Sequence, residues 1–363
     1  MSKARLMTRP EDFQKIGIKP GIVELWEDGR RAGSDAGVNE VWYFDATMED
    51  GTKTVVGFRP KTLEATGVDG DSPNLNIDIV MPDGKEYRDM IYVPVEQSEI
   101  SKESCNVRFG EHSVVGDLKN YTIKIEPVNG IGCELHYEAL VKPFRPGGTA
   151  HVALGDNDEF YYTDMSIPKN KVTGTITVDG KTIEVNGFGY HDHQWMNLTP
   201  MAAYHHWLWG RLYAGEYTLV IYDFITTERF GFTRIPILGI LDGNGDVIFD
   251  NTKPVDCQIE LYHQEEMKKD FPKKSNYTFN DHGKTVKLNI EWLEEIEVRN
   301  LYGWANEQQK AAYDQAGIMP TYMRYYAKAD LTILEEGKAD IHETGDMIYE
   351  FAYFGKPDSR AHL

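Results

Sequence analysis

The sequence predicts an all-β protein of antiparallel sheets, arranged as sandwiches or barrels, with helix as a minor component. Short segments rich in Val, Ile, Tyr and Thr recur along the chain with apolar and polar residues in alternation, which is typical of strands with one buried face. Turn signals separate these segments throughout, unlike the alternation of strands and helices in βαβ units. The length of 363 residues exceeds what one core usually supports, so we expect two domains.

The first half of the chain contains clear hairpin patterns. A strand expected over residues 40–45 precedes the turn at 48–51 and a second strand over 52–58, which is the arrangement of a hairpin. The same order of strand and turn returns in two further places, residues 76–80 with Pro82-Asp83-Gly84 and residues 172–178 with Asp179-Gly180.

The second half continues with strands over residues 216–224 and 235–241, and the turn Asp242-Gly243-Asn244-Gly245 then reverses the chain. One segment has a helical composition, residues 304–316, followed by Gly317 and Pro320. Gly and Pro in those positions end helices. We therefore expect one clear helix among many strands.

Composition excludes several classes of partner. The 38 Lys and Arg against 58 Asp and Glu give a net charge of −20, which repels nucleic acid and anionic membrane surfaces. The three cysteines, Cys105, Cys133 and Cys257, are far apart and suggest neither disulfides nor a thiolate metal site, so a reducing compartment fits best. We find no secretory signal and no apolar run long enough to span a membrane, and we expect a cytoplasmic protein. The oligomeric state cannot be read from the sequence.

Chemistry is concentrated between Tyr190 and Trp209. This stretch holds four histidines, one carboxylate, three tryptophans and two tyrosines: His191, His193, His205, His206, Asp192, Trp195, Trp207, Trp209, Tyr190 and Tyr204. If the first part is a strand, His191, His193 and Trp195 project from one face. Tyr190, Asp192 and Gln194 then project from the other. We expect His and Trp to share the wall of an organic-ligand pocket.

Two other interpretations of this cluster stay open. The residues could be packed core side chains with satisfied hydrogen bonds. The spacing of His191 and His193 on a strand also suits a metal ion, with His205 or His206 as a third ligand. No acidic or cysteine ligand close in sequence completes that set, and we predict no metal.

Asp223 interrupts the otherwise apolar strand of residues 219–224. Burial disfavours an ionised carboxylate, so Asp223 could stay protonated near neutral pH and serve as a general acid. An alternative of equal weight is that Asp223 caps a strand end or forms an ion pair with Arg229 or Arg234 at the surface. Alternation places Tyr222 on the opposite face of the strand.

The chain resembles the superfamily of carotenoid 1,2-hydratase and kievitone hydratase, which also includes decalin-forming Diels–Alderases. The resemblance is sharpest over about residues 160–225, and its motif is the strand step Gly187-Phe188-Gly189-Tyr190 followed by Asp192-His193-Gln194-Trp195. It implies two lipocalin-like β-barrel domains, residues 1–198 and 199–363, with a ligand pocket near their junction. Many relatives are similar in having Asn before the Trp and Gly after it, where this chain has Gln194 and Met196.

The resemblance implies catalytic roles for His193, Trp195, Tyr222 and Asp223. In the hydration of an alkene, Asp223 would donate the proton, Trp195 and Tyr222 would stabilise the carbocation, and His193 would orient or deprotonate the water. A second set of residues is expected to bind the substrate: Tyr190, His191, Asp192, Trp207, Trp209 and His206.

The predicted function is a hydratase or dehydratase that acts on an alkene of an apolar isoprenoid, prenylated or polyphenolic small molecule. Such chemistry needs no cofactor, and the chain has no phosphate-binding glycine motif. Relatives differ in reaction, so fold alone does not decide it. A pericyclic cyclase or isomerase of the Diels–Alderase kind and a non-catalytic binding protein for hydrophobic ligands are the alternatives.

Overall fold

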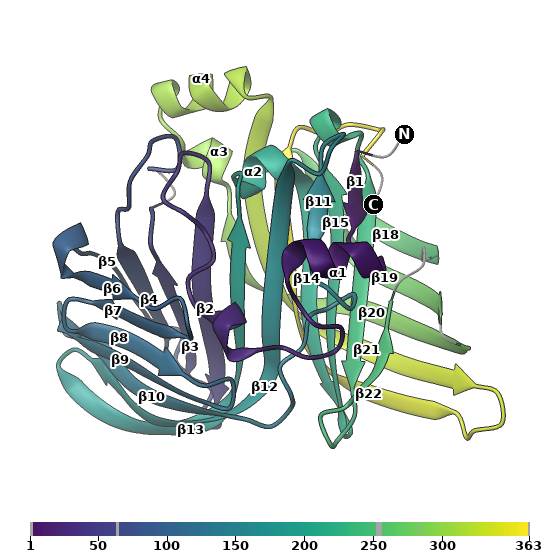
Figure 1. The fold of residues 1–363 in the computed structure, drawn as a ribbon, viewed down its shortest axis with the longest axis horizontal. Helices are drawn as coiled ribbons and strands as arrows, with labels where there is room; N and C mark the ends of the chain where they lie inside the picture. The colour runs from purple at the N-terminus through teal and green to yellow at the C-terminus, as the bar shows by residue number, and fades with distance from the viewer. Residues whose placement is uncertain (1–2, 63–64, 252–255, 282, 362–363) are drawn as a thin grey trace.

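Two curved antiparallel sheets lie side by side in the computed structural model, which describes residues 3–62, 65–251, 256–281 and 283–361. Figure 1 shows the first sheet, formed by the earlier part of the chain, next to the second sheet, formed by the later part. The all-β class with lipocalin-like curled sheets and minor helix is confirmed. The division into domains at residues 198 and 199 stays a prediction.

The first sheet has 13 strands within the described residues, and its main path runs in the order β5-β4-β3-β2-β13-β12-β10-β9-β8-β7-β6. A small extension pairs β1 with β11 and β11 with β12. The strands are β1 (Ala4–Leu6), β2 (Asn39–Met48), β3 (Lys53–Arg59), β4 (Asn74–Val80), β5 (Glu86–Tyr92), β6 (Ser98–Ile100), β7 (Asn106–Phe109), β8 (His112–Gly116), β9 (Asn120–Val128), β10 (Ile131–Ala139), β11 (Val152–Leu154), β12 (Phe160–Val178) and β13 (Lys181–Met196).

The second sheet has nine strands in the described part of the chain, in the order β17-β16-β15-β14-β22-β21-β20-β19-β18. Its strands are β14 (Tyr204–Ala214), β15 (Tyr217–Thr226), β16 (Arg234–Leu241), β17 (Val247–Asp250), β18 (Asp256–Gln264), β19 (Lys269–Asp281), β20 (Lys284–Arg299), β21 (Ile318–Glu335) and β22 (Ile341–Gly355). The strands predicted over 40–45, 52–58, 76–80, 172–178, 216–224 and 235–241 are confirmed by β2, β3, β4, β12, β15 and β16.

Helices are few and short. They are α1 (Pro10–Ile16), α2 (Pro200–Ala203), α3 (Leu301–Trp304) and α4 (Glu307–Gln315), with the 3-10 turns η1 (Leu25–Asp28), η2 (Val95–Gln97) and η3 (Glu228–Phe230). The single helix predicted over residues 304–316 is wrong at its start. Asn306 caps α4, because its side chain accepts the backbone N–H of Gln309, so Trp304 ends a separate turn, α3.

Each sheet encloses its own apolar core, and a third apolar cluster lies between the sheets. The first core contains Trp42 and Phe44, and the second contains Leu208 and Phe351. The third cluster combines side chains of both sheets, including Tyr162, Tyr190, Trp209, Tyr222 and Phe224. The sheet faces that meet at this junction are therefore buried as well as the barrel interiors.

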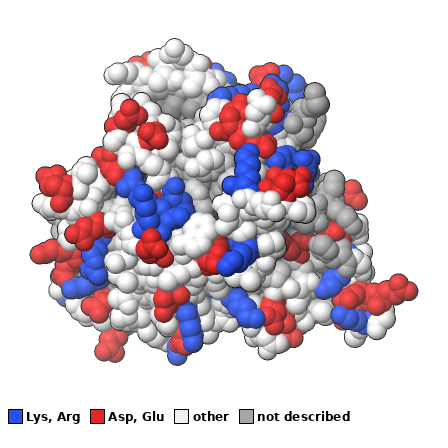
Figure 2. Space-filling model, viewed as in Figure 1, with Lys and Arg blue, Asp and Glu red and all other residues white. Residues whose placement is uncertain are grey.

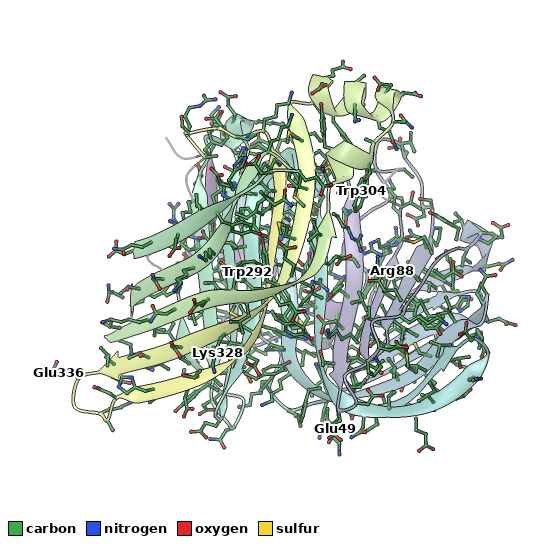
Figure 3. All side chains as sticks on the ribbon, turned by 180° about the vertical axis from the view of Figure 1, so that it is seen from behind. Glu49, Arg88, Trp292, Trp304, Lys328 and Glu336 are labelled. Carbon is green, nitrogen blue, oxygen red and sulfur yellow. The ribbon has the colours of Figure 1, made fainter. Side chains whose placement is uncertain are left out.

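Polar contacts join the two sheets at several points. Arg211 of β14 forms an ion pair with Asp45 of β2, and the Tyr213 hydroxyl donates a 2.7 Å hydrogen bond to the carbonyl of Pro168. Arg88, labelled on the first sheet in Figure 3, lies 3.8 Å from Glu297 of the second sheet. These contacts hold the sheet faces in a defined relation.

Charged residues of both signs are interspersed over the surface seen in Figure 2. The net negative charge is therefore distributed on that face among positive groups. Among the described residues, no helix has the length and apolar character needed to cross a membrane.

Candidate functional site

A cavity of about 270 Å³ lies at the junction of the two sheets. This volume is near the lower end of the range for small-molecule pockets. We call it the junction cavity, and its lining is Val41, Tyr43, Arg59, Tyr162, Asp192, Gln194, Met196, Pro200, Tyr204, Trp207, Trp209, Tyr222, Phe224, Tyr322, Arg324 and Glu350. The wall is thus mainly aromatic with a few ionisable groups.

Alternation along β13 places Asp192, Gln194 and Met196 on the cavity side. Tyr190 projects on the same side, since its hydroxyl lies 3.1 Å from that of Tyr222. Gln194 and Met196 are the two positions that depart from the residues common in relatives. Both departures therefore alter the wall of the junction cavity.

The histidines of β13 lie on the other face, inside the core of the first sheet. The ring of His191 stacks on Phe44 at 4.0 Å, and the ring of His193 stacks on Trp42 at 4.4 Å. Trp195 packs beside His193 and does not line the cavity. The expectation that His and Trp share a pocket wall is wrong, because both faces of β13 are buried and the cavity adjoins the opposite one.

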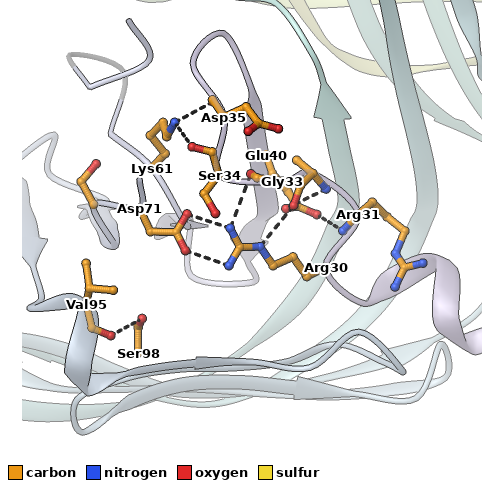
Figure 4. A network of polar contacts seen from close by, with 12 residues as sticks. Arg30, Arg31, Gly33, Ser34, Asp35, Glu40, Lys61, Asp71, Val95 and Ser98 are labelled. Carbon is orange, nitrogen blue, oxygen red and sulfur yellow. Dashed lines mark hydrogen bonds and ion pairs between the residues drawn. The ribbon is translucent and has the colours of Figure 1, made fainter. Parts of the chain in front are cut away.

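His193 connects the core to η1 and, through Glu40, to the segment that follows η1. Its Nδ1 lies 3.0 Å from the Glu27 carbonyl and its Nε2 lies 2.9 Å from Oε1 of Glu40. Glu40 also accepts the backbone N–H groups of Arg31 and Ala32. Figure 4 shows Glu40 and Arg31 in this network. His193 is thus placed to position this segment and has no contact with the junction cavity.

The neighbouring residues of β15 also point in opposite directions. Tyr222 lines the junction cavity, whereas the fully buried carboxylate of Asp223 lies inside the second sheet. Arg234 donates to Asp223 through Nε at 2.9 Å, and the Tyr277 hydroxyl donates at 3.2 Å. The structure contains the ion pair with Arg234 that was one of the alternatives, but the carboxylate is buried and not at the surface. Asp223 does not face the ligand cavity, contrary to the expectation for a general acid.

The aromatic and histidine residues of β14 are divided in the same way. Trp207 and Trp209 line the junction cavity, as expected for substrate binding, and Tyr204 joins them. His206 points away from the cavity and lies with its Nδ1 2.8 Å from that of His205. Its ring packs near Phe351. His206 and His191 thus occupy different cores and not one site.

A carboxyl that sequence reasoning missed, Asp164, contacts Tyr222 of the cavity wall from behind. Asp164 of β12 accepts a 2.6 Å hydrogen bond from Tyr222, and Tyr222 lies next to Tyr190. Asp164 is paired with Gln194 in the ladder between β12 and β13, and Ser166 is paired with Asp192. Asp164 and Asp192 are therefore diagonal neighbours on one face of the sheet. A carboxylate within the apolar run of β12 was the available signal.

Burial makes both carboxyls hard to ionise. Loss of solvent raises the pKa of Asp164 to about 7, although the hydrogen bond from Tyr222 lowers it. The pKa of Asp192 is raised well above its ordinary value, first by burial and then by the charge of Asp164. Two neighbouring carboxyls of this kind hold a proton at neutral pH.

A second polar group, also missed from the sequence, lies on the same cavity. Arg324 of β21 donates to Glu350 of β22 at 3.2 Å and to the Tyr43 hydroxyl at 3.3 Å. Glu350 further accepts from Tyr322 at 2.6 Å and from Trp207 at 3.0 Å. Glu350 is therefore held by three donors, and its ion pair with Arg324 occupies both groups.

The described residues contain no group of three or more His, Cys, Asp or Glu side chains arranged to hold a metal ion. The histidines considered as ligands lie in separate cores, with His191 and His193 in the first sheet and His205 and His206 in the second. The arrangement instead supports a cavity for an organic molecule, with the buried carboxyl of Asp192 on its wall.

A family model described as Diels-Alderase-like matches residues 34–283. The chain belongs to the Diels-Alderase-like family. The matched segment includes β2, β12, β13 and β15, which supply both carboxyls and Tyr222. The superfamily resemblance drawn from the sequence is thereby confirmed.

Three relatives of this Diels-Alderase-like chain illustrate the range of its family. The quinolone epoxide rearrangement protein penF of Penicillium thymicola is 22% identical over 70% of this chain and 70% of its own length. The Diels-Alderase ucsH of Acremonium sp is 21% identical over 70% of this chain. The ceramide-binding protein svf1 of Emericella nidulans is 22% identical over 64% of this chain. The chain spans 64% of the length of each of these last two relatives.

Solved structures share the fold at low identity. A putative AttH from Nitrosomonas europaea matches with a TM-score of 0.62 and 14% identity, covering 93% of this chain and 99% of that one. CghA bound to Sch210972 matches with a TM-score of 0.61 and 13% identity over 93% and 97%. Kievitone hydratase from Nectria haematococca matches with a TM-score of 0.54 and 12% identity, covering 92% of this chain and 93% of that one. These likenesses establish the two-sheet architecture.

Proposed function

We propose that this protein is a cofactor-independent enzyme that rearranges or cyclises an apolar isoprenoid, prenylated or polyphenolic small molecule in the junction cavity. The observation that carries the proposal is Asp192, a carboxyl held protonated by burial and by Asp164 on the wall of an aromatic cavity. A proton donor in a water-poor, aromatic site can activate a substrate oxygen or alkene at neutral pH.

The four polar side chains at this wall have complementary roles in the proposal. Asp192 faces the substrate and donates a hydrogen bond or a proton to it. Asp164 shares the negative charge left behind, and Tyr222 stabilises that charge with its 2.6 Å hydrogen bond to Asp164. Gln194 donates to Asp192 at 3.0 Å and fixes the carboxyl plane. The proton returns to Asp192 when the product loses one, so no net proton is consumed.

The apolar lining supplies the shape component of catalysis. Trp207 and Trp209 line the cavity together with Phe224, and their rings can stabilise positive charge that develops on the substrate. A closely fitting wall also holds a flexible molecule in a reactive conformation. Both effects serve a rearrangement or a cyclisation, in which bonds are exchanged within the substrate.

Relatives support this class of reaction over hydration. The names of penF and ucsH report an epoxide rearrangement and a Diels–Alder reaction, which both proceed without addition of water. Hydration or dehydration remains the second candidate, because the same protonated Asp192 could protonate an alkene. His193, expected to activate the water, is not among the described residues that line the cavity.

Binding without chemistry is the remaining alternative. The relative svf1 is named as a ceramide-binding protein, and an aromatic cavity would also hold an unreactive hydrophobic guest. Protonated carboxyls then serve only as hydrogen-bond donors to the ligand.

The test compares the wild type with Asp192→Asn on a panel of epoxides, polyenes and prenylated phenols, with products analysed by mass spectrometry. Asp156→Asn, in the exposed turn before β12, is the matched control. We expect a product of unchanged mass and altered retention from the wild type and the control. Loss of the acid should lower turnover about 100-fold or more.

The other outcomes are equally distinct. A gain of 18 mass units, the mass of one water molecule, would show that the reaction is hydration and not rearrangement. Recovery of every compound unchanged, with saturable quenching of tryptophan fluorescence, would show that the protein binds these compounds without catalysis. Full turnover by Asp192→Asn overturns the assignment of the acid.

A further inference from the structure

The junction cavity contains a positive charge that no neighbouring carboxylate neutralises. Arg59 of β3 lines the cavity, and among the described residues no carboxylate lies within ion-pair distance of it. Its guanidinium donates through one Nη to the side-chain oxygen of Asn76 at 2.7 Å. Arg324, the other guanidinium of the lining, is already paired with Glu350.

The local backbone is shaped to hold this guanidinium. Gly57 is two residues before Arg59 on the same face of β3, and a Cβ built there would lie 2.9 Å from the Arg59 guanidinium and 2.7 Å from the Asn76 oxygen. The absence of a side chain at Gly57 therefore makes room for Arg59 to lie along the strand. Asn76 then fixes one edge of the guanidinium, and the remaining N–H groups stay available to a ligand.

The acidic groups near Arg59 are either neutral or paired with other residues. The charge of Asp78 acts on Arg59, but the Asp78 carboxylate accepts a hydrogen bond from Asn76 at 2.7 Å and lies 3.3 Å from Arg88. Asp192 is held in its neutral form, and Glu350 is satisfied by Arg324. A guanidinium removed from water without a counterion is unfavourable, and a bound anion would correct this. Arginine is also the side chain best suited to two parallel hydrogen bonds with an oxygen anion.

We propose that the junction cavity takes an amphipathic anion, an apolar molecule with one ionised oxygen group such as a carboxylate, whose charged group binds Arg59. This inference deepens the proposed function and rests on it for the identity of the site. Register places Tyr43 between Asp192 on one side and Gly57 on the other, so the acid and the guanidinium cradle lie two strand spacings apart, roughly 10 Å. The ionised group of the substrate is therefore separated by several bonds from the group that Asp192 activates.

The test measures binding of decanoate and of decanol at pH 7.5 by quenching of tryptophan fluorescence, to which the cavity residues Trp207 and Trp209 contribute. The two compounds differ in charge but have the same apolar chain. The wild type should bind decanoate at least about tenfold more tightly than decanol. Arg59→Gln should remove this preference while affinity for decanol changes less than about twofold. Arg108→Gln, an exposed arginine of β7, is the matched control and should behave as the wild type.

A second variant protects the test against misfolding of Arg59→Gln. Gly57→Ala keeps the arginine but displaces its guanidinium, because the added methyl meets only the ends of the Arg59 and Asn76 side chains. It should weaken binding of decanoate and not of decanol. Equal affinity of the wild type for the two compounds, or a preference that survives both substitutions, would overturn the inference.

The outcome is separable from that of the proposed function. Asp192→Asn should keep the preference for decanoate and lose turnover. A preference for decanoate with a fully active Asp192→Asn overturns only the acid mechanism, and an inactive Asp192→Asn without any preference overturns only the anion site.

Discussion

The hydroxyl of Tyr222 donates a 2.6 Å hydrogen bond to the carboxyl of Asp164, and this bond joins β15 of the second sheet to β12 of the first. Residues 58 positions apart in the chain thus form one polar wall, with Tyr190 and Asp192 beside them. The ionisation of Asp164 is consequently controlled from the opposite sheet. This relation leads to the first two predictions.

Replacing Tyr222 by Phe should move the pH dependence of activity. The hydroxyl lowers the pKa of Asp164, so its removal raises that pKa further and keeps the acid pair protonated to higher pH. We expect the alkaline decline of kcat/KM to move upward by about one to two pH units, the effect of one hydrogen bond to a charged group. The measurement is kcat/KM between pH 5 and 9.

Tyr349→Phe is the control for Tyr222→Phe, because the Tyr349 hydroxyl contacts Ser275 inside the second core. Its profile should stay that of the wild type. An unmoved decline in Tyr222→Phe would show that Asp164 does not take part in the acid pair.

The raised pKa of Asp164 should make the stability of the protein depend on pH. That pKa is about 7 in the folded chain against an ordinary value of 3.8. Between these values the folded state binds a proton that the unfolded state lacks, so this group makes the free energy of unfolding fall as pH rises from about 4 to 7. Asp164→Asn cannot ionise and should lose this contribution.

Urea unfolding at pH 4.5 and pH 7.5 provides the measurement for Asp164→Asn. The difference in the free energy of unfolding between the variant and the wild type should shift in favour of the variant by about 2–4 kcal/mol from pH 4.5 to pH 7.5. Asp156→Asn, on an exposed turn, should show no such shift. An identical pH dependence in Asp164→Asn and the wild type would contradict the prediction.

His193 should be important for stability more than for turnover. His193→Gln loses the 2.9 Å contact with the buried Glu40 side chain, and removing the partner of a buried polar group costs about 1–3 kcal/mol. Denaturant midpoints should fall accordingly, while kcat measured on the folded fraction changes less than about tenfold. His136→Gln, an exposed histidine of β10, is the control. A stable His193→Gln protein without turnover would restore His193 to the reaction.

Asp223 should likewise act through the fold. Asp223→Asn and Arg234→Gln each remove the same buried ion pair, so their effects on unfolding free energy should be coupled by about 0.5–3 kcal/mol in a double-mutant cycle. Turnover per folded molecule should persist in Asp223→Asn, in contrast to Asp192→Asn. Additive effects on stability, or an inactive but stable Asp223→Asn, would contradict this account.

The predictable part of the site followed from local alternation. Tyr190, Asp192 and Gln194 were expected on one face of a strand and His191, His193 and Trp195 on the other, and β13 has this arrangement. The face that carries His193 and Trp195 does not adjoin the junction cavity, whereas Asp192, expected to bind the substrate, lines it. A strand between a barrel core and a sheet junction is buried on both sides. Period-two alternation distinguishes the two faces but does not say which one adjoins a cavity.

Other residues of the site could not be found in this way. Arg59, Arg324 and Glu350 are far in the chain from β13, and each looks like an ordinary polar residue in its own strand. Their common place on the junction cavity depends on strand order and on how the sheets pack. The start of α4, by contrast, could have been predicted from the sequence, because Asn306 is a favoured N-cap residue.

The sequence by itself determined the all-β class, most hairpins, the family and the alternating faces of β13 and β15, because these depend on neighbours within a few residues and on a shared motif. Only the tertiary structure decided that Asp164 and Asp192 form an acid pair and that Asp223 is paired with Arg234. Burial and the approach of charges from other strands control carboxyl ionisation, and those conditions arise when the two sheets meet.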